Sequence, residues 1–120
     1  MLSIGVFQNH STKVVLSTAQ EASHVIVTSA AWVSGFAFSN ANGSARTAQL
    51  FDSATLPSDG VFPNVIGQST ATAASAYVSY VNSPFYFASG IVICNSSTVR
   101  TKTIGSADSL FAVWYVTINT

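Results

Sequence analysis

The feature that most constrains this sequence is its strand-like alternation, in which β-branched and aromatic residues recur at every second position along most of the chain. No segment of useful length shows the three-to-four-residue spacing of apolar positions that an amphipathic helix requires. Turn-forming residues interrupt the apolar runs at intervals of roughly 8–14 residues, as they do in antiparallel sandwiches and barrels. We therefore expect an all-β protein, a single antiparallel β-sandwich or jelly-roll-like domain of about eight strands.

The length of 120 residues suits one domain, and no internal repeat, linker or block of charge divides the sequence. We expect a single β domain over residues 1–120, with residues 31–118 forming the core of the sandwich. Residues 1–30 either form an N-terminal arm or add extra strands, and the sequence leaves both alternatives open.

Alternating segments and short apolar runs mark the expected strands, and Gly, Pro and Asn mark the breaks between them. The turn at residues 40–43 is expected to be a tight hairpin, because an Asn-Gly pair tolerates positive φ. Residues 82–84 are expected to stop one strand, and Gly90 to kink a central one. The expected strands are residues 2–8, 14–16, 24–28, 31–38, 45–52, 62–66 (short or at a sheet edge, because Pro63 has no amide hydrogen), 77–81, 85–94, 98–104 and 110–118, with residues 69–76 extended and further turns at 56–60 and 105–108.

The segment 31–38 has a two-sided pattern in which large and small residues alternate. A strand over this segment places Trp32, Phe36 and Phe38 on one face. The opposite face carries small residues, which let a neighbouring layer approach closely. We therefore expect the three aromatic side chains to lie together.

Charged residues make up only 7% of the sequence, and four Lys or Arg cancel four Asp or Glu. Hydroxyl groups supply the polarity instead, from 19 Ser and 12 Thr. Such a surface loses little desolvation energy when another protein covers it, and a net charge near zero favours association. We expect a protein that works in a symmetric assembly, with copies of itself or another protein as partners.

Nucleic acids and membranes are not expected partners. Four basic residues, Lys13, Arg46, Arg100 and Lys102, are too few to build a face that follows a phosphate backbone. No apolar stretch approaches the length of a membrane-spanning helix, and no basic segment precedes the first apolar run as in a signal peptide.

No group of residues has the spacing of a catalytic or metal site, so we expect no enzyme activity, no cofactor and no metal. His10 and His24 lie in polar segments and are interpreted as surface or partner-facing residues, although a small hydrolase using either one stays open. Cys94 continues an apolar strand and is interpreted as a small buried residue, and a single cysteine excludes an intrachain disulfide. The carboxylates are interpreted as structural groups beside turns: Glu21, Asp52, Asp59 and Asp108.

Aromatic residues suggest a second kind of site, a platform on which sugar rings stack. Most of them alternate with Val, Phe and Ala in expected strands, so packing in a core or an interface explains them more simply. The aromatic residues considered are Trp32, Trp114, Tyr77, Tyr80, Tyr86 and Tyr115.

From about residue 30 to residue 118 the order of signals resembles a group of small virion proteins of tailed bacteriophages. The matching signals are a Gly-containing strand that ends at Asn (33–40), a strand ending in Phe51-Asp52 and followed by Ala, Pro and Gly (48–60), a Pro-bearing edge segment (62–66), an aromatic strand leading to Gly and then Ser (85–97), and a Gly-Ser-Ala-Asp turn (105–108) before an apolar closing strand. The sequence departs from the family at two positions, with Phe51 where Tyr is frequent and Cys94 where the residue is usually small.

The resemblance implies a non-enzymatic structural protein of the virion, assembled in the host cytoplasm. A capsid decoration or cement protein that binds and stabilises the lattice of the major capsid protein is the leading hypothesis. The alternative is a tail-associated, fibre or adsorption module that binds a glycan of the host surface, and a secreted lectin-like domain is a weaker one.

Overall fold

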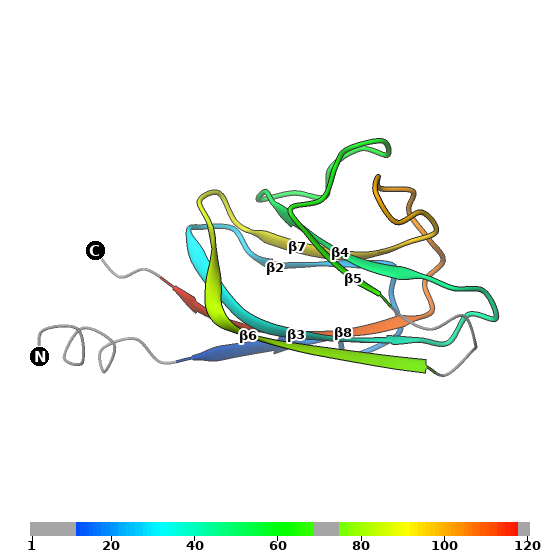
Figure 1. Cartoon of the computed structure of the whole chain (residues 1–120), viewed down its shortest axis with the longest axis horizontal. Coiled ribbons are helices and arrows are strands. Elements are labelled where there is room, and N and C mark those ends of the chain that lie inside the picture. The colour runs from blue at the N-terminus through cyan, green and yellow to red at the C-terminus, as the bar shows by residue number, and fades with distance from the viewer. Residues whose placement is uncertain (1–11, 69–74, 118–120) are drawn as a thin grey trace, which may run out of the picture.

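The structure, a computed structural model, describes residues 12–68 and 75–117 and consists there of eight β-strands without a helix (Figure 1). No described segment could therefore cross a membrane as a helix. The strands are β1 (Lys13–Leu16), β2 (Ser23–Val27), β3 (Ala31–Asn40), β4 (Thr47–Asp52), β5 (Val65–Gln68), β6 (Ser75–Phe87), β7 (Ile91–Ser96) and β8 (Ser109–Thr117).

The strands form two sheets of four, which confirms the expected all-β sandwich. Sheet A has the order β1-β8-β3-β6, and sheet B has the order β2-β7-β4-β5. The antiparallel pairs β1–β8, β2–β7, β3–β6 and β4–β5 show that the chain is one long antiparallel ribbon folded at the β4–β5 connection. Pairing of β3 with β8 and of β4 with β7 then divides the rolled ribbon into two layers. This order is the jelly-roll topology.

The core lies between the two sheets and is built from every second side chain of the long strands. Phe38 and Phe111 are cross-strand neighbours on β3 and β8, and their rings stack at a centroid distance of 5.8 Å. The buried core residues are Ile26, Ala31, Val33, Phe36, Phe38, Ala48, Leu50, Phe87, Ile91, Ile93, Phe111, Val113 and Tyr115.

The prediction that Trp32 shares a face with Phe36 and Phe38 is wrong. The register of β3 shifts between Val33 and Gly35 against both of its neighbours, so one extra residue separates the inward-facing Val33 from the inward-facing Phe36. A β-bulge of this kind reverses the alternation. Trp32 therefore lies on the opposite face and remains 40% exposed, whereas Phe36 and Phe38 are buried in the core.

The expected break at residues 82–84 is also wrong, because β6 runs through it. The pairing with β3 passes from Gly35–Tyr80 directly to Val33–Phe85, so the four residues between Tyr80 and Phe85 oppose a single residue of β3. This bulge accommodates Pro84, and β6 is the last strand of sheet A, where a missing amide hydrogen leaves no ladder bond unmade.

Residues 85–94 form two strands in different sheets instead of one kinked strand. Gly90 lies at the crossing with a φ of 149°, and a Cβ there would stand 2.6 Å from the Val27 carbonyl oxygen and 2.7 Å from that of Ser53. No side chain fits in this position without moving the backbone. Gly90 is thus a fixed point at which the chain leaves sheet A and enters sheet B.

Two connections differ from the prediction. Residues 40–43 do not make a hairpin, since they join β3 of sheet A to β4 of sheet B, and the turn is held by the side chains of Asn40 and Asn42. Residues 98–104 form no strand, apart from one isolated bridge between Ile104 and Ser96. They belong to a loop that lies over sheet B.

Of the first 30 residues, 13–27 supply β1 and β2, the outermost strands at one side of each sheet. The expected strand at residues 2–8, His10, the segment 69–74 and residue 118 lie outside the described residues.

Candidate functional site: the open face of sheet A

The outer face of sheet B is covered by the chain's own loops, residues 53–64 and 97–104, which rise above β4 and β7 in Figure 1. We call these two segments the loop cover. They pair with each other, because Gly60 N donates to Lys102 O at 2.8 Å and Lys102 N donates to Val61 O at 2.9 Å. Over the two central strands, β4 and β7, the outer face of sheet B is therefore an internal surface.

Gln49 fastens the loop cover to the sheet. Its side chain points outward from β4 and is fully buried, and Nε2 donates to the carbonyl oxygens of Thr98, Val99 and Thr101, each at 3.0 Å. Ser96 on β7 adds to this, because its hydroxyl donates to Thr98 O at 2.8 Å and accepts from Thr103 N at 3.0 Å. These bonds satisfy backbone groups of an irregular segment that is not part of a β-sheet.

Lys102 is the most deeply buried charge, at 3% exposure, and its Nζ donates to Asp59 Oδ1 at 2.5 Å. Asp59 also accepts from Ile104 N at 3.2 Å. These two hydrogen bonds, that from Lys102 first, hold the pKa of Asp59 below its ordinary value of 3.8. Asp59 is thus a structural group, and it ties the two segments of the loop cover together.

Cys94 lies beneath the loop cover, opposite Gln49 in the β4–β7 register and therefore on the same face of sheet B. It is fully buried, and burial raises the pKa of its thiol to about 12. A thiol in this state holds very little thiolate at neutral pH, so it is inert.

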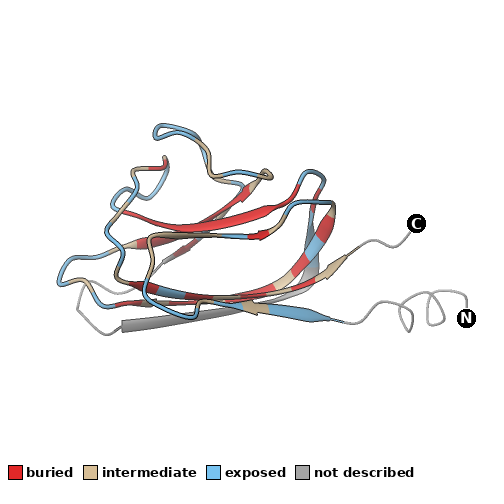
Figure 2. Ribbon diagram, turned by 180° about the vertical axis from the view of Figure 1, so that it is seen from behind, coloured by how far each residue is buried: buried red, intermediate tan, exposed pale blue. Residues whose placement is uncertain are grey.

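The outer face of sheet A differs in that no described segment covers it. Cross-strand neighbours show which side chains share this face: Val14 opposite Trp114, Leu16 opposite Ala112, and Trp32 opposite both Tyr86 and Val116. Figure 2 shows the same contrast, with exposed β1 along one sheet and the buried strand β7 in the other. We call this surface the open face. Its described members are apolar or small, and they are Val14, Leu16, Trp32, Gly35, Ala37, Ser39, Tyr86, Leu110, Ala112, Trp114 and Val116.

The open face is apolar and carries no charge among its described side chains. Leu16 is 57% exposed, Tyr86 49%, Val14 45% and Leu110 43%. The single charged residue on its described strands is Lys13, which lies opposite the inward-facing Tyr115 and so belongs to the other side of the sheet. A contiguous exposed apolar patch of this kind makes the open face the candidate binding surface of the described residues.

One aromatic pair stands at the end of the open face where β3 pairs with β6. The rings of Trp32 and Tyr86 have a centroid distance of 5.0 Å and an interplanar angle of 50°. Both rings are 40% or more exposed, so they present a corrugated aromatic surface to the outside. The other aromatic residues divide: Tyr115 is buried in the core, Trp114 is half-buried on the open face, and the side chains of Tyr77 and Tyr80 lie outside the described part.

The histidine within the described residues has a structural contact. His24 Nδ1 lies 2.8 Å from Glu21 Oε2, and Ser17 Oγ donates to the same carboxylate oxygen at 2.6 Å. A nucleophilic serine needs its hydroxyl on the histidine, with the carboxylate behind it. Here the Ser17 hydroxyl bonds to the carboxylate and accepts from Phe111 N at 2.9 Å, so the three groups fasten the segment before β2 to β8.

The remaining carboxylates also hold backbone or side-chain donors. Asp52, at the end of β4, accepts from Ser89 N at 2.8 Å and Ala88 N at 3.1 Å and so caps the turn between β6 and β7. Asp108 accepts from Asn42 Nδ2 at 2.7 Å. Within the described residues, no three His, Cys, Asp or Glu side chains come together as a metal site requires.

Neither a protein-family model nor a curated protein matches this sequence. Function is therefore inferred from the open face itself.

Trp32, Tyr86 and Trp114 of the open face are among the aromatic candidates of the sequence, but the pattern does not predict the open face itself. A signal was present in β8, where apolar residues occupy both faces: a strand that borders solvent on one side should alternate with polar residues. The bulge in β3 concealed the rest, because without it Trp32 counts as a core residue.

Proposed function

We propose that this protein is a non-enzymatic structural component of a bacteriophage virion, a capsid decoration protein that binds the lattice of the major capsid protein through the open face. The observation that carries the proposal is the uncharged, apolar outer surface of the described part of sheet A. A partner that covers this surface removes apolar area from water without having to strip charged groups of their hydration.

The size of the open face is consistent with binding a protein. Three strands of about nine residues and the four-residue β1, at about 4.8 Å spacing and 3.3 Å rise, give a flat area of about 500 Å². Burying that area contributes about 13 kcal/mol at 25 cal/mol per Å², against an association cost of roughly 4–15 kcal/mol. One copy would thus bind with moderate strength, and self-association of copies on the lattice would add avidity.

Two further points support a virion component. The sequence resembles small virion proteins over most of its length, and the jelly roll is a fold found in viral capsid and lectin domains. The jelly-roll fold supports the proposal by analogy, because one fold can serve many functions.

The test is to purify virions and measure the copy number of this protein by quantitative mass spectrometry. We expect a high, symmetry-related copy number, and stripped particles that regain stability when the protein is added back. The variant Trp32→Ser should lose binding to stripped particles, whereas Val61→Ser, which removes an apolar side chain of similar exposure from the loop cover over the opposite sheet, should retain it. Absence of the protein from the particle would end the proposal.

A second candidate function is supported by the Trp32–Tyr86 pair. Exposed aromatic rings on a sandwich surface suit the apolar faces of sugars, as a tail module that binds a host glycan would require. Leu110 separates the two functions, because it lies at the far end of the open face, opposite Ser39, while Trp32 lies opposite Val116. Saturable binding of host polysaccharide that Trp32→Ala abolishes and Leu110→Lys spares would favour the glycan module.

A further inference from the structure

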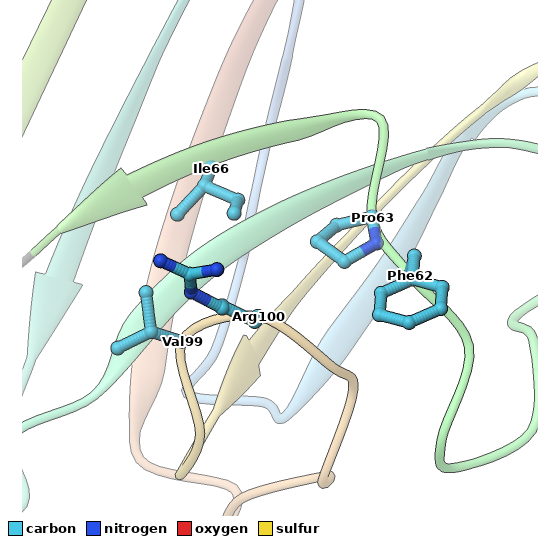
Figure 3. A pocket seen from close by; sticks show the side chains of 5 residues that line it. All are labelled: Phe62, Pro63, Ile66, Val99 and Arg100. Atoms are coloured by element: carbon cyan, nitrogen blue, oxygen red, sulfur yellow. The ribbon is translucent and has the colours of Figure 1, made fainter.

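A second apolar surface lies at the edge of sheet B, away from the open face. It is an open pocket of about 500 Å³ lined by Phe62 and Pro63 from the segment before β5, Ile66 from β5, and Val99 and Arg100 from the loop after β7 (Figure 3). Figure 3 shows the Arg100 side chain extending from its loop toward Ile66, with the rings of Phe62 and Pro63 beside one another across the pocket.

The walls of the pocket are apolar and exposed. Phe62 is 74% exposed, the highest value among the described large apolar residues, and Val99 and Ile66 are 44% and 42% exposed. Phe62 and Val99 belong to the loop cover and Ile66 to β5, but none of the three is part of the buried core, so their exposed area is available to a ligand.

Arg100 gives the pocket its single charge. Its guanidinium makes no hydrogen bond or ion pair within residues 12–68 and 75–117. The chain's own carboxylates do not serve it, because all four are engaged elsewhere: Glu21 with His24, Asp52 with the 88–89 amides, Asp59 with Lys102, and Asp108 with Asn42. A carboxylate that pairs with Arg100 must therefore come from another molecule.

The backbone beside the pocket offers a further means of binding. β5 is the last strand of sheet B, and in the described part of the chain it is paired on its β4 side alone. An extended peptide that pairs with the other edge would place every second side chain on the outer face of sheet B, where the pocket lies.

We propose that this pocket binds an extended segment of a partner protein in which an apolar side chain and a carboxylate lie two residues apart. The apolar side chain contacts Phe62, Pro63 and Ile66, and the carboxylate pairs with Arg100. A second copy of this chain is a poorer occupant, because each of its four Asp and Glu side chains already accepts a hydrogen bond from its own chain. A nucleic acid does not fit, since one guanidinium among apolar walls does not follow a phosphate backbone.

The test uses the whole protein and a capped heptapeptide of Ser and Thr that carries one phenylalanine and one aspartate two positions apart. The peptide is titrated while the backbone amide resonances are followed by NMR. We expect shifts confined to the amides of residues 62, 64–68 and 98–101 and a Kd below about 1 mM. Replacing the aspartate of the peptide by asparagine should weaken binding about fivefold or more, because a charge-assisted bond to Arg100 is lost.

The variant Arg100→Gln should bind the aspartate and asparagine peptides equally, and Lys13→Gln, which removes an exposed cation from sheet A, should behave as the unchanged protein. An unchanged amide spectrum outside the pocket shows that the Arg100→Gln variant is folded. Absence of shifts at 2 mM peptide, or equal affinity of the unchanged protein for the two peptides, would overturn the inference. Neither result bears on the proposed function, which is tested separately on the open face by binding to stripped particles.

Discussion

The two sheets of this sandwich differ in what covers their outer faces. Sheet B has its outer face closed by the loop cover, in which a buried amide, Gln49, and a buried ammonium, Lys102, bind polar backbone and carboxylate groups. Sheet A has an outer face of similar apolar character that the described chain leaves exposed. The described chain covers one outer face and leaves the other exposed, and the exposed face is the one that we propose binds a partner.

In a protein with few charges, the side chains on the two faces distinguish a surface that the chain covers from a surface that can bind a partner. Polar side chains beneath a cover must have fixed partners, because an unsatisfied buried group is costly. A surface that binds and releases a partner carries groups that tolerate both water and burial, and uncharged aromatic and aliphatic side chains meet that condition. The open face has this second composition.

The largest effect is expected from a substitution that detaches the loop cover from sheet B. Gln49→Ala removes the donor shared by three loop carbonyls and leaves a cavity, which should lower the free energy of unfolding by about 3 kcal/mol. Cys94, beneath the same cover, reports the opening directly: its labelling by a thiol reagent should accelerate on the order of a hundredfold. Denaturant unfolding and labelling kinetics measure the two effects on one sample.

The control for that experiment is Trp32→Ser on the open face. It should leave the labelling rate of Cys94 unchanged, because Trp32 does not contribute to the cover. If Gln49→Ala destabilised the protein without exposing Cys94, the bonds from Gln49 would not be what fastens the loops.

A smaller effect follows from Asp59, whose side chain is 53% exposed and whose ion pair with Lys102 is therefore partly screened. Its pKa is lower in the folded protein than the ordinary value of 3.8, so the charged form stabilises the fold above that pH. Asp59→Asn should be less stable than the unchanged protein at neutral pH. The difference should shrink as the pH falls below 3.8 and the carboxylate of the unchanged protein takes up its proton.

Unfolding midpoints at neutral pH and well below 3.8 check the sign. A difference that persisted undiminished in acid would mean that Asn at this position disturbs the loop cover by its shape and not by the loss of charge.

The alternation of the sequence sufficed for the fold class, for the strand at residues 45–52 and for the apolar closing strand, because each of these depends on local pattern. The burial of Cys94 followed from the same pattern. What could not be predicted depends on contacts distant in sequence. The bulge between Val33 and Gly35 exists only against β6 and β8, and the path of β6 through Pro84 depends on its place at a sheet edge.

The loop cover illustrates the same limit most clearly. Residues 98–104 have a strand-like composition, yet the side chain of Gln49, some fifty residues earlier, takes up their carbonyl groups. No window of local sequence contains that pairing. The open face was hidden for a related reason, because its position depends on the register of three strands and not on any one of them.

The substitution that should change the stability least, Leu110→Lys, should weaken association most. Leu110→Lys places a charge in the open face at a side chain that is already 43% exposed, so the free energy of unfolding should change by less than about 1 kcal/mol. Binding to stripped particles, measured by co-sedimentation, should fall at least about tenfold, because the ammonium must lose its hydration when the face is covered.

Val61→Lys is the matched control, since Val61 is 41% exposed but belongs to the loop cover. If both variants bound as well as the unchanged protein, the open face would not be the surface that meets the capsid. If Leu110→Lys lowered the free energy of unfolding as strongly as Gln49→Ala, the chain itself would pack against the open face. The two sheets would then not differ in how their outer faces are covered.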